Sequence, residues 1–267
     1  MLLDQKTAIV YGGGGAVGAA VARTFAREGA TVHLAGRTEA KLLAVAGDIR
    51  AAGGAAATAV VDALDQDAVD AHAAQVVAAT GRLDVTFNAV GDDDGDQGIP
   101  LVELTADAYV RPVADYVRTH FVTARAAARQ MTAQGSGVIL PLSNPMAGEP
   151  AALTGPYGQA CAAVENLARQ LAAELGPHGI RVVCLRPTGM PETAQRLGSH
   201  TRATWSRAAR RLGMTLEEML PQVAAGSPLG RALTVADVAE VAAFVASDRA
   251  AGMTGTVANV TAGAVRD

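Results

Sequence analysis

The sequence predicts an α/β fold, a doubly wound parallel sheet in a single domain. Seven short apolar runs alternate with longer, alanine-rich stretches of helical length. The runs lack polar alternation, which is typical of strands buried on both faces of a parallel sheet. No linker or change of composition divides the 267 residues, so we expect residues 1–267 to form one domain.

The expected elements follow one another in a regular order. Strands are predicted at residues 7–11, 31–35, 57–61, 85–89, 137–142, 181–186 and 256–260. Helices are predicted at residues 17–28, 39–52, 65–80, 106–134, 157–175 and 235–246. Glycine marks several helix ends, at Gly29, Gly53, Gly54, Gly81 and Gly176.

Two segments interrupt this order. Residues 91–100 form an acidic, glycine-rich loop, and residues 187–230 form an arginine-rich insertion with predicted helices at 201–212 and 216–223. Both leave strands at the carboxyl edge, where open α/β sheets bind ligands. The insertion is therefore a candidate substrate lid, and a packed surface excursion is the alternative.

Composition excludes several classes of function. Twenty-two basic residues stand against 26 acidic ones, a net charge of −4, which argues against a nucleic-acid partner. No uninterrupted apolar run is long enough to span a membrane, and the amino-terminal run lacks a signal-peptide layout. Cys161 and Cys184 form no C-x-x-C pair. We expect a cytoplasmic protein with a small-molecule substrate.

The acidic loop resembles a calcium-binding template only in part. Asp92, Asp94, Asp96 and Glu103 fall on positions 1, 3, 5 and 12 of that template. The glycine required at position 6 is Gln97. We therefore expect an exposed acidic loop and no metal.

A glycine-rich turn follows the first predicted strand, from Tyr11 through Gly12, Gly14 and Gly15 to Gly18. Glycines allow a tight turn and let backbone N–H groups approach a pyrophosphate at the start of a helix. The order of strand, turn and helix favours a dinucleotide site over a plain glycine-rich connection.

These residues resemble the short-chain dehydrogenase/reductase family, whose turn reads T-G-x-x-x-G-x-G; Tyr11 replaces the threonine and Ala16 the middle glycine. The segment from Phe87 to Gly91 matches the family's N-N-A-G in part, and residues 227–231, 237–239 and 253–255 match its carboxyl-terminal pattern. The resemblance implies a Rossmann-type fold and a nicotinamide cofactor. It implies cofactor contacts at Gly12, Gly14, Gly15, Ala16, Val17, Gly18, Arg37, Thr38, Asp62, Ala63, Asn88, Ala89, Val90, Pro187 and Thr188.

The end of the second strand bears on the choice between NAD and NADP. A carboxylate there would bind a ribose 2′-hydroxyl and repel a 2′-phosphate. The sequence instead has Arg37 and Thr38, with no acid before Glu39. An arginine can bind phosphate through two charge-assisted hydrogen bonds. We predict NADP(H), with a solvated surface arginine as the alternative reading of Arg37.

The catalytic pattern that the resemblance implies is incomplete. The family places a tyrosine and a lysine four residues apart on one helix face, and here these positions hold Tyr157 and Cys161. The chain has only two lysines, Lys6 and Lys41, so no later lysine can substitute. Without a neighbouring cation, Tyr157 is expected to donate a proton in carbonyl reduction but to be a poor base for alcohol oxidation.

The other family positions are also altered. The carbonyl-orienting serine corresponds to Asn144, or to Ser143 after a shift of one residue. Either side chain can donate a hydrogen bond, and either can instead hold a turn at the strand end. The proton-relay asparagine corresponds to Tyr116. His120 and His200 are alternative acids, although a lone histidine is more often structural.

Two functions therefore stay open. One is an NADP(H)-dependent carbonyl reductase that uses Tyr157 with Ser143 or Asn144. The other is a member of the same fold without redox activity, such as an isomerase, dehydratase, cyclase or non-catalytic partner.

The first predicted helix of the insertion could attract an anionic substrate or could be a solvated amphipathic helix. Its relevant residues are Trp205, Arg202, Arg207, Arg210 and Arg211. The resemblance also implies a homo-oligomer, a dimer or tetramer, paired through helices 106–134 and 157–175.

Overall fold

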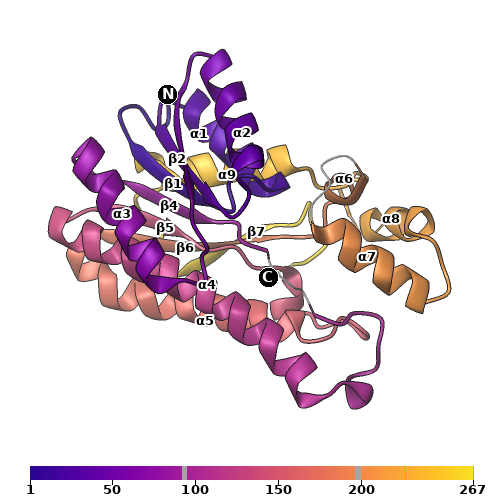
Figure 1. Ribbon diagram of the computed structural model, residues 1–267. Helices are drawn as coiled ribbons and strands as arrows, with labels where there is room; N and C mark the ends of the chain where they lie inside the picture. Colours follow the sequence, from indigo (N-terminus) through magenta and orange to yellow (C-terminus); the bar gives the residue numbers. More distant parts are fainter. Residues whose placement is uncertain (92–94, 196–199, 226, 267) are drawn as a thin grey trace.

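Seven parallel strands form the central sheet of the computed structural model, which describes residues 1–91, 95–195, 200–225 and 227–266 (Figure 1). Their spatial order is β3-β2-β1-β4-β5-β6-β7, so the chain winds outwards from the middle in both directions. This order confirms the predicted doubly wound sheet in a single domain. The strands are β1 (Thr7–Tyr11), β2 (Thr31–Gly36), β3 (Ala55–Val60), β4 (Val85–Asn88), β5 (Gly137–Leu140), β6 (Ile180–Pro187) and β7 (Thr256–Val260).

Helices cover both faces of the sheet (Figure 1). One face carries α1 (Ala16–Arg27), α2 (Glu39–Ala51) and α9 (Val235–Ala246), and the other carries α3 (Gln66–Thr80), α4 (Ala106–Gln134) and α5 (Tyr157–Leu175). Each face has its own apolar core, because neighbouring strand residues point to opposite sides. In β1, for example, Val10 packs in the first core and Ile9 in the second.

Two predicted strand boundaries were displaced by two residues, and the other differences are of one residue. β5 ends at Leu140, two residues earlier than predicted, directly before Pro141, which lacks the N–H that a ladder needs. β3 runs from Ala55, opposite Thr31 of β2, whereas the prediction began at 57. Pairing with the neighbouring strand sets this boundary, and the pattern of residues does not reveal it.

The insertion at 187–230 contains α6 (Pro191–Gln195), α7 (His200–Arg211) and α8 (Leu216–Ala224). The last two agree with the predicted helices, whereas α6 was not predicted. Short 3-10 turns, η1 (Leu101–Glu103), η2 (Pro145–Ala147), η3 (Gly176–His178) and η4 (Asp248–Ala250), complete the described elements.

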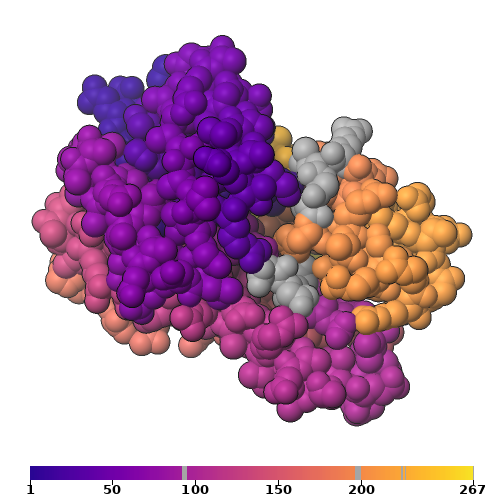
Figure 2. Space-filling view, viewed as in Figure 1, coloured from indigo at the N-terminus to yellow at the C-terminus, as the bar shows by residue number. Residues whose placement is uncertain are grey.

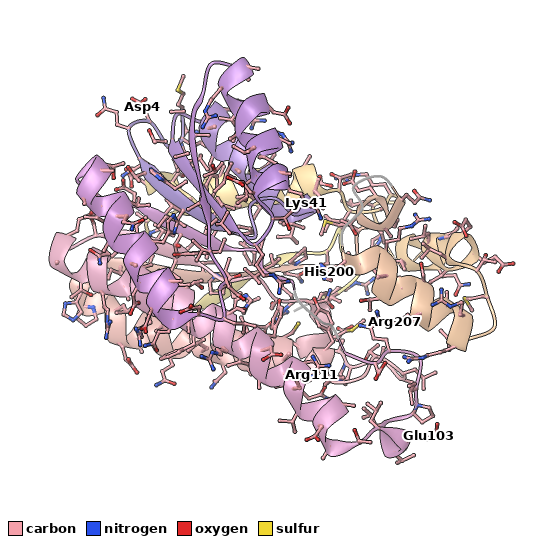
Figure 3. All side chains as sticks on the ribbon, in the orientation of Figure 1. Asp4, Lys41, Glu103, Arg111, His200 and Arg207 are labelled. Atoms are coloured by element: carbon pink, nitrogen blue, oxygen red, sulfur yellow. The ribbon has the colours of Figure 1, made fainter. Side chains whose placement is uncertain are left out.

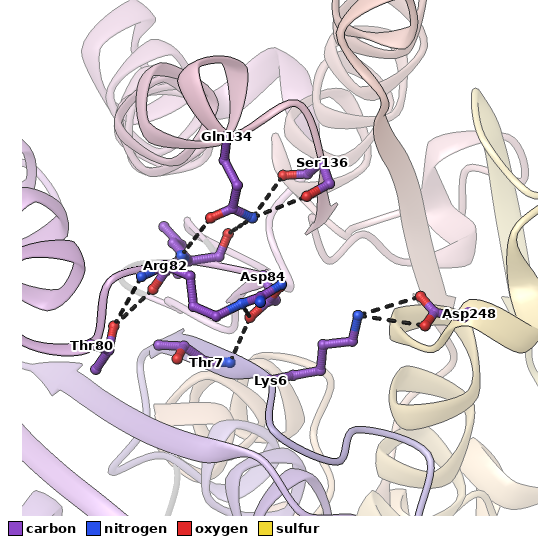
Figure 4. A network of polar contacts seen from close by, with 9 residues as sticks. Lys6, Thr7, Thr80, Arg82, Asp84, Gln134, Ser136 and Asp248 are labelled. Carbon is purple, nitrogen blue, oxygen red and sulfur yellow. Dashed lines mark hydrogen bonds and ion pairs between the residues drawn. The ribbon is translucent and has the colours of Figure 1, made fainter.

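A polar network ties together the amino ends of β1 and β4 (Figure 4). The buried Asp84 carboxylate accepts hydrogen bonds from the Thr7 N–H at 2.8 Å and the Arg82 Nε at 2.7 Å. Nearby, Lys6 pairs with Asp248 at 3.5 Å. This network secures one edge of the sheet, and the cleft lies at the opposite edge.

Candidate functional site

A cleft of about 1140 Å³ opens at the carboxyl edge of the sheet. It is lined by the turns after β1, β2, β3 and β4, by the segments after β5 and β6, and by the insertion. Figure 2 shows the hollow between the indigo and purple amino-terminal half and the orange helices α7 and α8. Parallel α/β sheets bind ligands at this edge, near the reversal of strand order between β1 and β4.

The turn after β1 has the shape of a phosphate cradle. Gly12 has φ +73°, and a Cβ there would come within 2.6 Å of the Ala89 carbonyl oxygen. Gly18 packs so tightly on the turn that a Cβ would collide with the Gly12 carbonyl. Gly15 caps α1 without a side-chain hydrogen bond, and the first turn of α1 holds no acid. The first N–H groups of α1 are thus suited to a pyrophosphate.

The end of β2 is positively charged. Arg37 and Thr38 follow β2 and line the cleft. Lys41 reaches the same place from the first turn of α2, where its Cβ lies over Gly14 (Figure 3). Lys41 was not predicted as a cofactor-binding residue, although its position three residues after the helix cap Thr38 was a usable signal.

The turns after β3 and β4 have different roles. Asp62 lines the cleft and accepts a hydrogen bond from the Leu64 N–H at 3.0 Å. Asn88 is buried, donates to the Thr123 hydroxyl at 2.8 Å and accepts from the Val90 N–H at 2.8 Å. Asn88 therefore shapes the loop that lines the cleft and does not line it itself.

Tyr157 begins α5 and faces the cleft. The ring of Tyr116, from α4, meets it edge to face with centroids 6.0 Å apart, and the Tyr116 hydroxyl donates to the Leu142 carbonyl at 2.8 Å. Cys161 is fully buried in the apolar core. The Cys161 thiol is therefore a core group and does not line the cleft.

Ser143 belongs to a buried ionic cluster. Its hydroxyl donates to the Glu165 carboxylate at 2.9 Å. Glu165 in turn receives two hydrogen bonds from Arg186, from Nε at 2.7 Å and from Nη2 at 2.9 Å. All three residues are less than one-tenth exposed. The single hydroxyl proton of Ser143 is already committed to this cluster.

Asn144, the neighbouring candidate, is partly buried and lines the cleft. Its Oδ1 accepts from the Met146 N–H at 3.1 Å, and its Nδ2 donates to the Pro187 carbonyl at 3.3 Å. An amide nitrogen carries two protons, so this side chain retains a second donor.

The two histidines are placed very differently. His120 is buried outside the cleft, bonded through Nδ1 to the Tyr116 carbonyl at 3.0 Å and through Nε2 to the Leu142 N–H at 3.4 Å. Burial lowers the pKa of His120 to about 4, so it is neutral at pH 7. His200 lines the cleft from the start of α7, with its ring against Gly91 (Figure 3).

Most of the residues that the sequence analysis selected meet in this cleft. Gly18 and Asn88 support it from behind. The others line it: Gly12, Gly14, Gly15, Ala16, Val17, Arg37, Thr38, Asp62, Ala63, Ala89, Val90, Ser143, Asn144, Tyr157, Pro187 and Thr188.

The described part of the chain contains no cluster of three or more His, Cys, Asp or Glu side chains arranged to hold a metal ion. Asp92 and Asp94, from the calcium template, lie outside the described residues. No described helix combines the length and apolarity needed to cross a membrane.

The fold and the cradle define a dinucleotide-binding α/β protein. A family model described as Enoyl-(Acyl carrier protein) reductase matches residues 14–265. An uncharacterized oxidoreductase of Mycobacterium tuberculosis is 34% identical over 238 residues, 87% of this chain and 89% of its own length. The short-chain reductase protein NovJ of Streptomyces niveus is 31% identical, with 97% of this chain and 94% of its own length covered.

Solved structures agree. A short-chain type dehydrogenase/reductase from Mycobacterium ulcerans superposes with a TM-score of 0.85 at 28% identity, covering 99% of this chain and 91% of its own. The chain belongs to the short-chain dehydrogenase/reductase family of oxidoreductases, whose members use NAD(P).

Proposed function

We propose that this protein is an NADP(H)-dependent oxidoreductase that reduces a carbonyl compound. The observation that carries the proposal is that one cleft joins Tyr157 to an uncapped glycine turn and a positively charged β2 end. A cleft that bound no cofactor would not need a phosphate-binding turn and cationic side chains beside Tyr157.

The residues present fit the cofactor. Arg37, Thr38 and Lys41 would hold the 2′-phosphate, because two cations and a hydroxyl converge there. The turn from Gly12 to Gly18 would hold the pyrophosphate. When bound, NADPH supplies the hydride.

Tyr157 would act as the proton donor. As the carbonyl is reduced to the alcohol, its oxygen would accept the phenolic proton of Tyr157, and solvent would return a proton to Tyr157. The cations among the described cleft-lining residues, other than histidine, are Arg23, Arg37 and Lys41, all from α1, α2 and the end of β2. No lysine follows Tyr157 on α5 to stabilise a phenolate. This environment favours reduction over oxidation.

Asn144 is the better candidate for orienting the carbonyl. The Ser143 proton is donated to Glu165, whereas one N–H of Asn144 remains to donate. We assign this positioning role to Asn144.

A second candidate function keeps the cofactor but not the redox step. The burial of Cys161 at the lysine position supports it, because the group that usually assists the tyrosine is missing. An isomerase, dehydratase or cyclase of this kind, or a non-catalytic partner, would bind NADPH without consuming it. The homo-oligomer and the cytoplasmic location stay predictions.

A titration of the protein with NADPH and with NADH, followed by nicotinamide fluorescence, tests the cofactor assignment. Arg37→Gln should weaken NADPH binding by about 10–100-fold and leave NADH binding nearly unchanged, because it removes charge-assisted bonds to the phosphate. Arg249→Gln is the matched control, since Arg249 is exposed in η4, away from the cleft. Equal affinity for both cofactors would refute the NADP assignment.

Turnover tests the chemistry. With 1-phenyl-1,2-propanedione as an activated carbonyl, Tyr157→Phe should lower NADPH consumption by about 10²–10⁴-fold. Asn144→Ala should lower it more than Ser143→Ala does. NADPH binding without consumption would favour the non-redox alternative, and full activity of Tyr157→Phe would exclude Tyr157 as the donor.

A further inference from the structure

The insertion closes one end of the cleft with apolar side chains. Trp205 comes from α7 and Met219 and Val223 from α8, and Leu212 directly follows α7. Met146, Leu153 and Met190 come from the segments after β5 and β6.

Trp205 forms a fixed part of this wall. A Cβ built on Gly189 would lie 3.1 Å from the indole ring and 2.8 Å from Val223, so the two side chains close directly over the Gly189 backbone. Behind it, Trp205 packs on Ala194, Leu216 and Leu220 of the small apolar core of the insertion. These contacts therefore hold the indole ring in place in the absence of a ligand.

The arginines of α7 do not line the cleft. None of Arg202, Arg207, Arg210 and Arg211 is among the described residues that line the cleft. Arg202 donates to the Ala194 carbonyl at 2.8 Å, and Arg211 pairs with Asp96 at 2.8 Å. The sequence alternative of an arginine-lined entrance for an anionic substrate is therefore wrong for these described residues.

Among the described residues, the acidic and basic side chains that line this end are Glu149 and His200. A carboxylate ligand would approach Glu149 with no described arginine or lysine lining this end to pair with, and desolvation of the unpaired charge would oppose binding. The hydroxyls of a polyol that lie against Trp205, Leu212, Met219 and Val223 would likewise lose water without gaining a hydrogen-bond partner there. A compact hydrocarbon body would gain from leaving water.

We infer that this end of the cleft selects a neutral carbonyl compound with a compact apolar body, such as a substituted cyclic ketone, over carboxylates and sugar-like ketones. This inference deepens the proposed function and rests on it for the role of the carbonyl. The binding preference itself depends only on the wall that α7 and α8 form.

Trp205 provides the readout, because it is the only tryptophan in the chain. Its emission, excited at 295 nm, would be titrated at pH 8 in the presence of NADP⁺. The two main probes are 4-tert-butylcyclohexanone and 4-oxocyclohexanecarboxylate, which share the ring and the ketone but differ in one substituent. D-Fructose represents sugar-like ketones. The neutral ketone should bind at least about tenfold more tightly than either of the others.

A charge placed on the wall sharpens the test. Leu212 lines the cleft and is 41% exposed, so the Leu212→Arg substitution should fold normally and should improve carboxylate binding by about tenfold relative to the neutral ketone. Leu229→Arg is the control, since Leu229 is 66% exposed and does not line the cleft. Equal or tighter binding of the carboxylate to the unmodified protein, or no change with Leu212→Arg, would overturn the inference.

The test separates this inference from the proposed function. Selective quenching of Trp205 by the neutral ketone without any NADPH consumption would support the pocket assignment and refute the reductase. Consumption of NADPH with an unselective pocket would do the reverse.

Discussion

Removing one partner of the buried pair between Glu165 and Arg186 should strongly destabilise the protein. The pair is bidentate, with distances of 2.7 and 2.9 Å, and the side chains are only 5% and 10% exposed. Removing one member of a buried pair costs about 3–5 kcal/mol of unfolding free energy. We expect this loss for Glu165→Leu, and a smaller one for Arg186→Met, because Arg169 still pairs with Glu165 at 3.6 Å.

The double variant, Glu165→Leu with Arg186→Met, should recover most of that loss. Replacing both partners of a buried pair by apolar side chains is often neutral or stabilising. One cost remains, because the Ser143 hydroxyl loses its acceptor, and we estimate it at about 1–2 kcal/mol. Adding Ser143→Ala should remove this remainder.

Urea unfolding followed by far-ultraviolet circular dichroism measures these differences. Glu240→Leu is the matched control: Glu240 pairs with Arg27 at the same 2.7 Å, but both side chains are more than half exposed. Such a surface pair contributes at most about 1 kcal/mol. If the single buried substitutions cost no more than the control, or if the double variant loses the sum of both, the reasoning is wrong.

Two further predictions concern pH and the glycine turn. Burial lowers the pKa values of His72 and His120 to about 4, below their unfolded values, so protonation favours unfolding. The free energy of unfolding should therefore be highest above pH 6.5 and fall by up to about 3 kcal/mol per histidine as the pH approaches 4. In thermal melts, the stability of His120→Gln should decline less steeply with falling pH. An unchanged pH dependence would contradict the role assigned to His120. In the glycine turn, Gly18→Ala should abolish tight NADPH binding, because the added Cβ would collide with the Gly12 carbonyl. Gly47→Ala is the control, since no atom lies within 4 Å of its new Cβ. This variant should bind NADPH normally and gain about 0.5–1 kcal/mol of unfolding free energy in urea.

The sheet and its flanking helices were predictable because their signals are local. Buried parallel strands are short and continuously apolar, and helices end at glycine or begin after a capping residue. The three helices starting at Ala106, Tyr157 and Val235 agree with prediction at both ends. The errors fall where a neighbouring strand or a proline determines the boundary, as in β3 and β5.

The site was predictable only as a set of residue types. The position of Tyr157 and the absence of a later lysine are facts of the sequence. The sequence also made Ser143 and its neighbour Asn144 equal candidates for the residue that orients the carbonyl. Which of them has a proton to spare depends on Glu165 and Arg186, which lie 22 and 43 positions beyond Ser143 along the chain.

By itself, the sequence therefore determined the order of most strands and helices and the glycine turn, because each depends on residues close together in the chain, and it shows that no lysine follows Lys41. The tertiary structure decided that Lys41 joins Arg37, that Cys161 belongs to the core, and that the arginines of α7 do not line the cleft. Those outcomes depend on which distant side chains pack together. Burial and pairing between distant segments are properties of the folded chain and leave no local pattern to read.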